Sequence, residues 1–485
     1  MRHSLHSALR WLAIAAACDA LAACGGGSSA APTVPPPVLT SLPSVRLSAA
    51  SAFAPGCDGA VATGTLYENA EVEPSLAVDP LDPTHLLAAW QQDRWSDGGA
   101  HSLMTASSFD TGHTWSTAMP TVAICAGGTV ANGAGYQRAS DPWLTYAADG
   151  TAYLLSLSFS GATLASGSSG AMLVLRSSDG GVSWGAPVTL ISDGSAAFDD
   201  KGAICADATD AHYVFATWDR LDVNNNGPTW FARTSDGGAS WEAARMIYDP
   251  GVGNQTLGNI PISLPNGTLL VVFTELDAVA GGTSATLKVI RSADRGLSWS
   301  APTAISPEQS AGVRDPLSGT LVRDGADIPA VAVDAAGTIY VVWQSSAFSA
   351  GARDAIAIAH SSDSGQSWSM PVRASGDLAA AAFIPNVRVR ADGLIGVGYY
   401  DLRNNMPANG QFQADYWLAT SADGATWTDT HVSGPFLLGG APFAEGLFLG
   451  DYQALGSSGS LFLPLFVTSG SDTSNRTDVY IAFGP

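Results

Sequence analysis

The sequence predicts an all-β fold built from a repeated unit, and three observations support this prediction. First, the 485 residues include 53 Gly and 27 Pro, and only 13% are charged, so turn formers abound and strong helix formers are scarce. Second, one short motif that ends in tryptophan recurs six times. Third, its copies are 57 to 69 residues apart, which is the length of one four-stranded sheet with its loops.

The N-terminus is predicted to be an export signal rather than part of the fold. Arg2 and Arg10 form a basic start, and residues 11–18 form a short apolar stretch. Leu-Ala-Ala-Cys24 follows, then Gly-Gly-Gly-Ser-Ser. This pattern resembles a bacterial lipobox, which implies lipidation of Cys24 and a place in the bacterial cell envelope, facing the periplasm or the cell exterior. The chain is therefore expected to divide into a signal peptide (1–23), a flexible tether (24–42) and a single domain (43–485).

Export implies a compartment that permits disulfides. Beyond residue 24 only Cys57, Cys125 and Cys205 remain, so at most one internal pair can form. We expect Cys57 to pair with Cys125, because both lie in loop-like sequence. Cys205 is expected to be buried on a strand as a small hydrophobe.

The charge balance excludes several classes of function. The net charge is −22, from 21 basic and 43 acidic residues, and such a field repels nucleic acids and anionic membrane surfaces. After the N-terminus no apolar run is long enough to cross a membrane. No P-loop, zincin or CxxC motif is present. We expect a monomer that contacts the membrane only through its lipid anchor.

The repeated motif has a conformational role. Its first copy, residues 108–115, reads Ser-Phe-Asp-Thr-Gly-His-Thr-Trp. The Asp accepts hydrogen bonds from nearby backbone N–H groups, Gly permits a positive φ, and the hydroxyl residues add local bonds. Each copy follows a strand-like run and so closes a hairpin. The six structural aspartates are Asp110, Asp179, Asp236, Asp294, Asp363 and Asp423.

A second set of markers repeats in step with the motif. Polar or small residues precede apolar runs at seven places: Glu73, Asp141, Asp200, Asn259, Asp327, Phe383 and Asp451. The last unit has only three strand-like runs and no motif, so residues 44–48 are expected to complete its sheet. A ring closed in this way has no exposed strand edges. The sequence therefore favours a β-propeller of seven blades, with six blades as the alternative.

The motif S/T-x-D-x-G-x-S/T-W resembles the Asp box of the sialidase superfamily, and the resemblance covers nearly the whole predicted domain. It implies an Asp-box propeller but no single function, because such propellers include sialidases, other glycosidases, sorting receptors and assembly factors. Sialidases carry an Arg that begins a carboxylate-binding triad, and Val72 stands at the matching position here. A second triad Arg is expected where this chain has Thr274-Glu275.

Two catalytic residues are nevertheless suggested by the resemblance. Tyr452, in Tyr-Gln-Ala-Leu, is similar to the context of the sialidase tyrosine nucleophile. Asp97, with Asp93 as the alternative, lies where the resemblance implies an acid/base carboxylate, in a loop before the first Asp box.

The starts of the innermost strands converge on the central channel of a propeller, so their polar residues form a candidate binding site. The same face is expected to receive residues that end the following strands. The alternative is an Asp–Arg network that only satisfies buried strand ends. The candidate binding residues are Glu73, Asp93, Arg94, Asp141, Asp200, Lys201, Asp327, Tyr400, Asp401, Arg403 and Asp451.

Residues 222–227, Asp-Val-Asn-Asn-Asn-Gly, match the first six positions of a calcium loop. Position twelve is Arg233 rather than Glu, and the segment joins two apparent strands. A plain Asn-rich hairpin loop is therefore the alternative to calcium, and no other cofactor or metal is predicted.

Three functions remain open from the sequence. The first is a module that recognises an extracellular glycan or peptide at the channel mouth. The second is an exo-glycosidase, either of the sialidase type or for neutral sugars, with Asp97 as acid/base and Tyr452 as nucleophile. The third is an envelope assembly scaffold. The missing arginines favour the first over a sialidase.

Overall fold

A computed structural model describes residues 39–60 and 63–485. The predicted signal peptide, Cys24 and the tether before residue 39 lie outside the described residues. Within the described part, regular structure consists of thirty β-strands and five one-turn 3₁₀ helices. The 3₁₀ helices are η1 (Ile124–Ala126), η2 (Val130–Asn132), η3 (Ala347–Ser349), η4 (Pro407–Asn409) and η5 (Leu438–Gly440). None of the helices in this part is long and apolar enough to cross a membrane.

The strands pair in consecutive antiparallel sets of four, which we call blades. Blade 1 contains β2 (Leu66–Val78), β3 (Leu86–Trp95), β4 (Ala100–Ser108) and β5 (Ser116–Ala118). Blade 2 contains β6 (Arg138–Tyr146), β7 (Ala152–Ser160), β8 (Ser169–Ser177) and β9 (Val188–Asp193). Blade 3 contains β10 (Ala197–Ala206), β11 (Val214–Asp222), β12 (Thr229–Thr234) and β13 (Arg245–Tyr248). Blade 4 contains β14 (Gln255–Ser263), β15 (Leu269–Val279), β16 (Gly282–Ser292) and β17 (Thr303–Glu308).

The remaining strands continue the same order. Blade 5 contains β19 (Ala330–Val333), β20 (Ile339–Ser345), β21 (Ala355–Ser361) and β22 (Val372–Arg373). Blade 6 contains β23 (Ala382–Val389), β24 (Ile395–Asp401), β25 (Gln413–Ser421) and β26 (Thr428–Leu437). Blade 7 contains β28 (Ala454–Ser458), β29 (Leu461–Ser469), β30 (Thr477–Ala482) and β1 (Ser44–Arg46).

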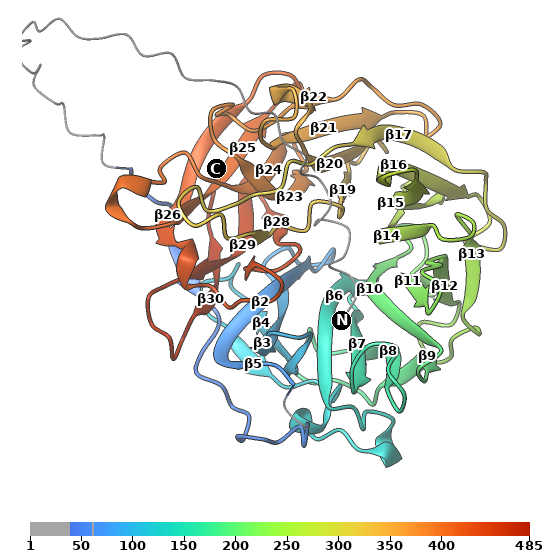
Figure 1. Ribbon diagram of the computed structural model, residues 1–485. Helices are drawn as coiled ribbons and strands as arrows, with labels where there is room; N and C mark the ends of the chain where they lie inside the picture. The colour runs from blue at the N-terminus through green and yellow to red at the C-terminus, as the bar shows by residue number, and fades with distance from the viewer. Residues whose placement is uncertain (1–38, 61–62) are drawn as a thin grey trace, which may run out of the picture.

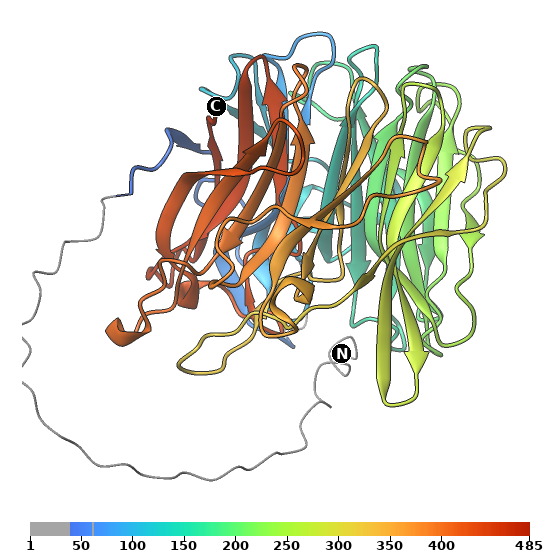
Figure 2. The ribbon, with the colours of Figure 1, turned by 90° about the horizontal axis from the view of Figure 1, so that it is seen from above.

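The blades surround a central axis, with the first strand of each nearest the centre (Figure 1). Figure 2, turned by 90°, shows the strands running mainly across the thickness of this ring. The predicted all-β propeller fold is thus confirmed. The grouping of its strands into seven blades is ours and follows the strand pairings. Blades 7, 1 and 2 are further joined into one hydrogen-bonded sheet by single bridges between β30 and β2 and between β4 and β6.

The N-terminal strand closes the ring. β1 pairs antiparallel with β30, with Val45 opposite Ile481. The backbone N–H of Leu47 then donates to the carbonyl of Val479 at 2.9 Å. The edge of the C-terminal blade is therefore covered by the other end of the described chain, which removes an edge open to aggregation.

The repeated motifs form hydrogen-bonded hairpin turns. In the first copy, the Ser108 hydroxyl accepts from the backbone N–H of Gly112 at 2.8 Å, and Asp110 accepts from the backbone N–H of Thr114 at 2.9 Å. The Thr114 hydroxyl also donates to Asp110 at 2.6 Å. These bonds, above all those from Thr114, lower the pKa of Asp110 to about 2. The six aspartates thus have the predicted structural role, since each accepts bonds of this kind from its own turn.

The glycine of the motif allows close packing on the neighbouring blade. Gly296 has a φ of +85°, and a Cβ added there would lie 2.4 Å from the Phe231 ring. The turn of blade 4 therefore sits directly on a buried aromatic side chain of blade 3.

The predicted Cys57–Cys125 disulfide is confirmed. Cys205 is free, as expected, and lies half-buried on β10, where burial raises the pKa of its thiol. The disulfide ties the segment between β1 and β2 to the loop that contains η1.

The calcium-like segment is a hairpin loop between β11 and β12. The Asp222 carboxylate accepts from the backbone N–H groups of Asn224 and Asn226, at 2.7 and 3.0 Å, and from the Asn226 amide at 2.8 Å. The loop's own donors therefore engage both oxygens of the carboxylate, which is the arrangement expected for the plain hairpin.

Candidate functional site

In five blades the residues predicted to start the innermost strand lie instead at a bulge within it. The pairing register shifts within β2, β6, β10, β14 and β23. At each shift one residue has a left-handed backbone, with φ between 49° and 63°. These residues are Glu73, Asp141, Lys201, Gly258 and Ile384. The expectation that the polar residues precede the strands was wrong for these five blades, because each strand begins before its bulge and continues through it. It was right for Asp327 and Asp451, which precede β19 and β28.

The left-handed conformation is unfavourable for a residue with a Cβ, by about 1–2 kcal/mol. Such strain concentrates at functional sites, where surrounding contacts hold it in place. Three consecutive blades carry a charged residue in this conformation: Glu73, Asp141 and Lys201. The bulges turn these three side chains toward one point.

Lys201 is the centre of this cluster. Its Nζ lies 2.6 Å from Asp451 Oδ2, 3.5 Å from Glu73 Oε1 and 3.6 Å from Asp141 Oδ1. The lysine side chain is 10% exposed and the three carboxylates are at most 4% exposed. Buried charges of this kind are stable only when they are paired, so the acids and the lysine depend on one another.

Two arginines complete the hub. Arg323 donates two hydrogen bonds to Asp451, one of them from Nε to Oδ1 at 2.8 Å. Arg94 donates to Gln91 at 2.7 Å, and its buried Nε has no hydrogen-bond partner. Both guanidinium groups lie over the Phe448 ring, at 4.8 Å for Arg94 and 4.6 Å for Arg323.

Two of the acids around Lys201, Glu73 and Asp141, have opposite pKa shifts. Burial raises the pKa of Glu73 from 4.5 to about 8, although Lys201 and Arg94 oppose this rise. Burial acts in the same direction on Asp141, but there the Lys201 charge and the hydrogen bonds with Glu73 and Asp200 together outweigh it, and the pKa falls to about 2. At neutral pH Glu73 is therefore mainly a neutral acid and Asp141 is a carboxylate.

Asp200 and Asp219 extend the cluster toward blade 3. They face each other across β10 and β11, and the Asp200 carboxylate accepts from the backbone N–H of Lys201 at 3.0 Å. Burial raises the pKa of Asp200 to about 7 and that of Asp219 well above its usual value. This side of the hub thus holds two further acids that bind their protons more tightly than usual.

Tyr452 lies in the hub but is not arranged as a nucleophile. Its hydroxyl donates to the carbonyl of Pro142 at 3.2 Å. Burial, together with the charges of Glu73 and Asp141, raises its pKa well above 10. A nucleophilic tyrosine needs a base that takes its proton, and no carboxylate of the described residues bonds this hydroxyl.

A pair of short strands covers the hub. β18 (Val322–Arg323) lies in the long connection between β17 and β19, and β27 (Leu447–Phe448) lies before β28. They pair in parallel, with Arg323 opposite Phe448. Figure 1 shows the yellow connection after β17 running across to the orange blades. Glu73 and Asp141 are 1% and 2% exposed beneath this cover, whereas the Arg323 side chain is 27% exposed.

The hub therefore unites seven of the sequence-predicted residues. They are Glu73, Arg94, Asp141, Asp200, Lys201, Asp451 and Tyr452.

The structure places Asp97 and Asp93 elsewhere. Asp97 pairs with Arg138 at 2.7 Å, and Thr63 donates to its other oxygen. Burial alone would raise its pKa, but these partners lower it, which disfavours a general acid at neutral pH. Asp93 bonds His101 at 3.0 Å, beneath the N-terminal segment.

Four further predicted binding residues also make contacts away from the Lys201 cluster. Asp327 is adjacent to Glu308, and burial raises the pKa of both groups, that of Glu308 to about 9. Tyr400 is buried and donates to the carbonyl of Val467 at 2.7 Å. Asp401 pairs with Arg403 at 2.5 Å, and Arg403 also pairs with Asp429 at 2.7 Å. Proximity to a strand end was therefore not enough to place a side chain in the hub.

Sequence reasoning missed several residues of the hub. Arg323 and Phe448 lie in connections that match no repeat, so no pattern marked them. Asp219 follows Trp218 at the end of β11, much as Asp93 follows the Trp90-Gln-Gln run near the end of β3. Because Asp93 lies outside the hub, beside His101, this similarity did not mark Asp219 as a hub residue.

Comparisons with known proteins add the following. No protein-family model matches the chain, and no curated protein matches it. A solved structure of a protein of unknown function from Dyadobacter fermentans is 14% identical, with 87% of this chain and 96% of that chain covered and a TM-score of 0.47. The Hadza microbial sialidase Hz136 is 13% identical, with 82% of this chain and 76% of that chain covered and a TM-score of 0.47. The α-L-arabinanase of Penicillium chrysogenum is 12% identical, with 71% of this chain and 93% of that chain covered and a TM-score of 0.42.

Proposed function

We propose that this chain is a recognition module that binds an extracellular glycan or peptide at the propeller hub, and that a lipid on Cys24 holds it at the bacterial cell envelope. The observation that carries the proposal is the set of three strained, charged residues on consecutive innermost strands: Glu73, Asp141 and Lys201. A core that needed only packing would fill these positions with glycine or apolar residues, as blades 4 and 6 do with Gly258 and Ile384.

The chemistry of the hub suits a ligand rich in hydroxyl or amide groups. Lys201, Arg323 and the neutral acid of Glu73 can donate hydrogen bonds, and the carboxylates of Asp141 and Asp451 can accept them. Sugars and peptides present donors and acceptors at close spacing and are bound by a few such converging polar groups. Arg323 is the partly exposed member of the set, so it is the first group that a ligand would meet.

A binding screen with matched variants tests this proposal. The wild-type chain is screened on a glycan array and a peptide library, and each hit is measured again with Arg323→Gln and Arg314→Gln. Both substitutions remove one positive charge from the same connection, but Arg314 is exposed and away from Asp451. We expect binding to fall at least tenfold with Arg323→Gln and to persist with Arg314→Gln. Equal binding by both variants, or no ligand in either screen, contradicts the proposal.

A second candidate function is glycoside hydrolysis by the hub acids. It is favoured by the opposite pKa shifts of Glu73 and Asp141, because acid and base roles require carboxyl groups with separated pKa values. Both groups lie near Lys201 Nζ, so their nearest oxygens are no more than about 7 Å apart. This upper bound includes the spacing of a retaining pair and that of a closely spaced inverting pair. Glu73 would protonate the leaving group, and Asp141 would act as nucleophile or base.

Turnover of a panel of aryl glycosides decides between these roles. If the hub acids catalyse hydrolysis, Glu73→Gln and Asp141→Asn lower kcat by at least a hundredfold, whereas Asp97→Asn and Tyr452→Phe keep most of the activity. If instead Asp97→Asn and Tyr452→Phe abolish turnover while the two hub variants keep it, Asp97 and Tyr452 are the catalytic pair, as the sialidase resemblance implies. Absence of turnover in the wild type, together with ligand binding, leaves the recognition module.

A further inference from the structure

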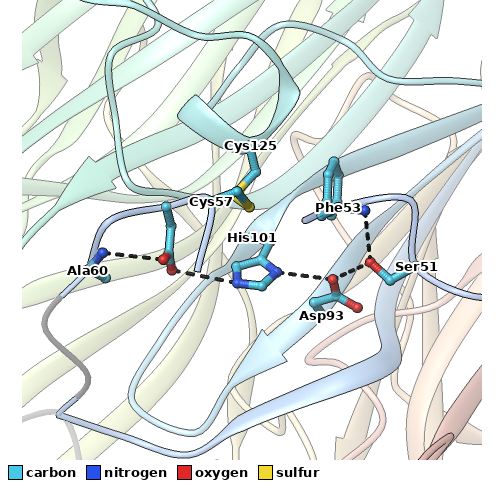
Figure 3. Close-up of a disulfide and its surroundings, with 8 residues drawn as sticks. Ser51, Phe53, Cys57, Ala60, Asp93, His101 and Cys125 are labelled. Carbon is cyan, nitrogen blue, oxygen red and sulfur yellow. Dashed lines mark hydrogen bonds and ion pairs between the residues drawn. A yellow bond between two sulfur atoms is a disulfide. The ribbon is translucent and has the colours of Figure 1, made fainter. Parts of the chain in front are cut away.

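A second cluster of polar groups lies beneath the N-terminal segment, outside the hub. His101 on β4 is 1% exposed. Its two ring nitrogens each approach a carboxylate. Nδ1 lies 3.0 Å from Oδ2 of Asp93, on β3, and Nε2 lies 3.7 Å from Oδ2 of Asp58. Figure 3 shows the Cys57–Cys125 disulfide beside this imidazole.

The contacts of Asp93 determine the tautomer of His101. Asp93 accepts from the Ser51 hydroxyl at 2.5 Å and from the backbone N–H of Asn69 at 2.8 Å. Both donors point at oxygens of Asp93, which is the arrangement of an ionised carboxylate. A carboxylate only accepts hydrogen bonds, so Nδ1 of His101 carries the proton it shares with Asp93. In the neutral ring the Nε2 atom then presents its lone pair.

Two atoms of this cluster are buried without a hydrogen-bond partner: His101 Nε2 and Asp58 Oδ2. Unpaired buried polar atoms are rare in folded proteins and call for an explanation. Both belong to side chains that are at most 2% exposed. Nε2 and Oδ2 are also the atoms through which histidine and aspartate bind transition metals.

The sulfur atoms complete a set of metal ligands. Both cysteine sulfurs and a ring nitrogen of His101 lie within 4.8 Å of one another. Around a tetrahedral Zn²⁺ the ligand atoms are about 2.0–2.3 Å from the metal, which separates two sulfurs by about 3.8 Å. In the oxidised protein the two sulfurs are bonded to each other, so they are not available as thiolate ligands.

We propose that reduction of the Cys57–Cys125 disulfide converts this cluster into a site for Zn²⁺ or a similar divalent transition metal. The ligands are the two thiolates and a ring nitrogen of His101, and the proposed fourth ligand is the Asp58 carboxylate, which lies 3.7 Å from Nε2. Asp93 is a positioning residue, because it holds the imidazole in the tautomer that leaves Nε2 free. A carboxylate that accepts from the far nitrogen of a ligating histidine is the common arrangement at such sites.

The chemistry balances with a dithiol as the reductant. The dithiol supplies two electrons and two protons, the S–S bond breaks, two S–H bonds form, and the dithiol becomes a cyclic disulfide. The metal then displaces both thiol protons to solvent and binds two thiolates. Both cysteines are partly exposed, so the reductant and the cation can reach them.

Cobalt absorption tests the proposal directly on the full chain. The protein is reduced with dithiothreitol, freed of it by gel filtration without oxygen, and titrated with Co²⁺. We expect one Co²⁺ per chain, with a thiolate-to-cobalt charge-transfer band and the visible bands of a tetrahedral site. Zn²⁺ should abolish these bands, and the oxidised protein should show none.

Matched variants identify the ligands. Cys205→Ser removes the remaining thiol of the described residues and should leave the spectrum unchanged, whereas Cys57→Ser with Cys125→Ser should abolish it. Asp93→Asn should keep the spectrum but weaken affinity by about 10–100-fold. Near-ultraviolet circular dichroism of each reduced sample establishes that the fold is retained. A folded, reduced wild type that binds no Co²⁺, or a spectrum that survives in the double cysteine variant, overturns the proposal.

Discussion

The substitution Glu73→Gln tests the electrostatics of the hub through the pH dependence of stability. In the unfolded chain Glu73 titrates near its ordinary value of 4.5, whereas burial in the fold raises its pKa to about 8. The folded state therefore binds this proton more tightly than the unfolded state. Its contribution to stability is fully present below pH 4.5 and is lost as the pH rises through about 8.

The size of the effect follows from the two pKa values. One pH unit corresponds to about 1.4 kcal/mol, so the rise from 4.5 to about 8 amounts to about 5 kcal/mol. This is an upper bound, because water entry and local relaxation relieve part of the burial. Gln has nearly the same shape and cannot ionise. We therefore expect the free energy of unfolding of Glu73→Gln to gain several kcal/mol over the wild type between pH 4.5 and pH 8.

Guanidinium unfolding at pH 4.5, 6, 7 and 8, followed by tryptophan fluorescence, measures this difference. Glu68→Gln is the matched control, because Glu68 lies on the same strand with an exposed side chain, and its stability should follow that of the wild type at every pH. A difference between Glu73→Gln and the wild type that does not change with pH would refute the reasoning. It would mean that Glu73 is ionised in the fold.

Three further predictions concern stability. Lys201→Met leaves buried carboxylates without their shared partner, so it should lower the free energy of unfolding at pH 7 by about 3–5 kcal/mol, measured by denaturant titration; a change below 1 kcal/mol would contradict the pairing. Gly296→Ala forces a Cβ against Phe231 in a left-handed backbone, so we expect a loss of about 1–3 kcal/mol in the same assay, and an unchanged midpoint would argue against this contact. The double variant Cys57→Ser, Cys125→Ser opens a link across 68 residues and should cost about 4 kcal/mol; equal melting temperatures of this variant and the oxidised wild type would contradict it.

The general plan of the molecule could be predicted from local patterns. The Asp–Gly–Trp motif encodes its own turn, because its hydrogen bonds join residues two to four positions apart, as at Asp110 and Thr114. The Cys57–Cys125 pair could also be inferred, since so few cysteines allow so few choices. The sequence indicated the bulges only in part. The polar residues at them were found, but their position within the strands was not, because a register shift depends on the partner strand.

The hub itself could be predicted only in part. Glu73, Asp141 and Lys201 were identified because they recur in step with the repeat. Arg323 was not, because it approaches Asp451 from 128 positions away in the chain.

By itself, the sequence determined the all-β propeller, its closing hairpins and the surplus of acids on its innermost strands. These properties depend on short-range hydrogen bonds and on the periodic spacing of side chains. Only the tertiary structure decided which acids keep their protons, which basic groups neutralise the others, and that His101 meets both cysteines. Charge interactions and burial act through space between residues that are distant in sequence, and no local pattern records those distances.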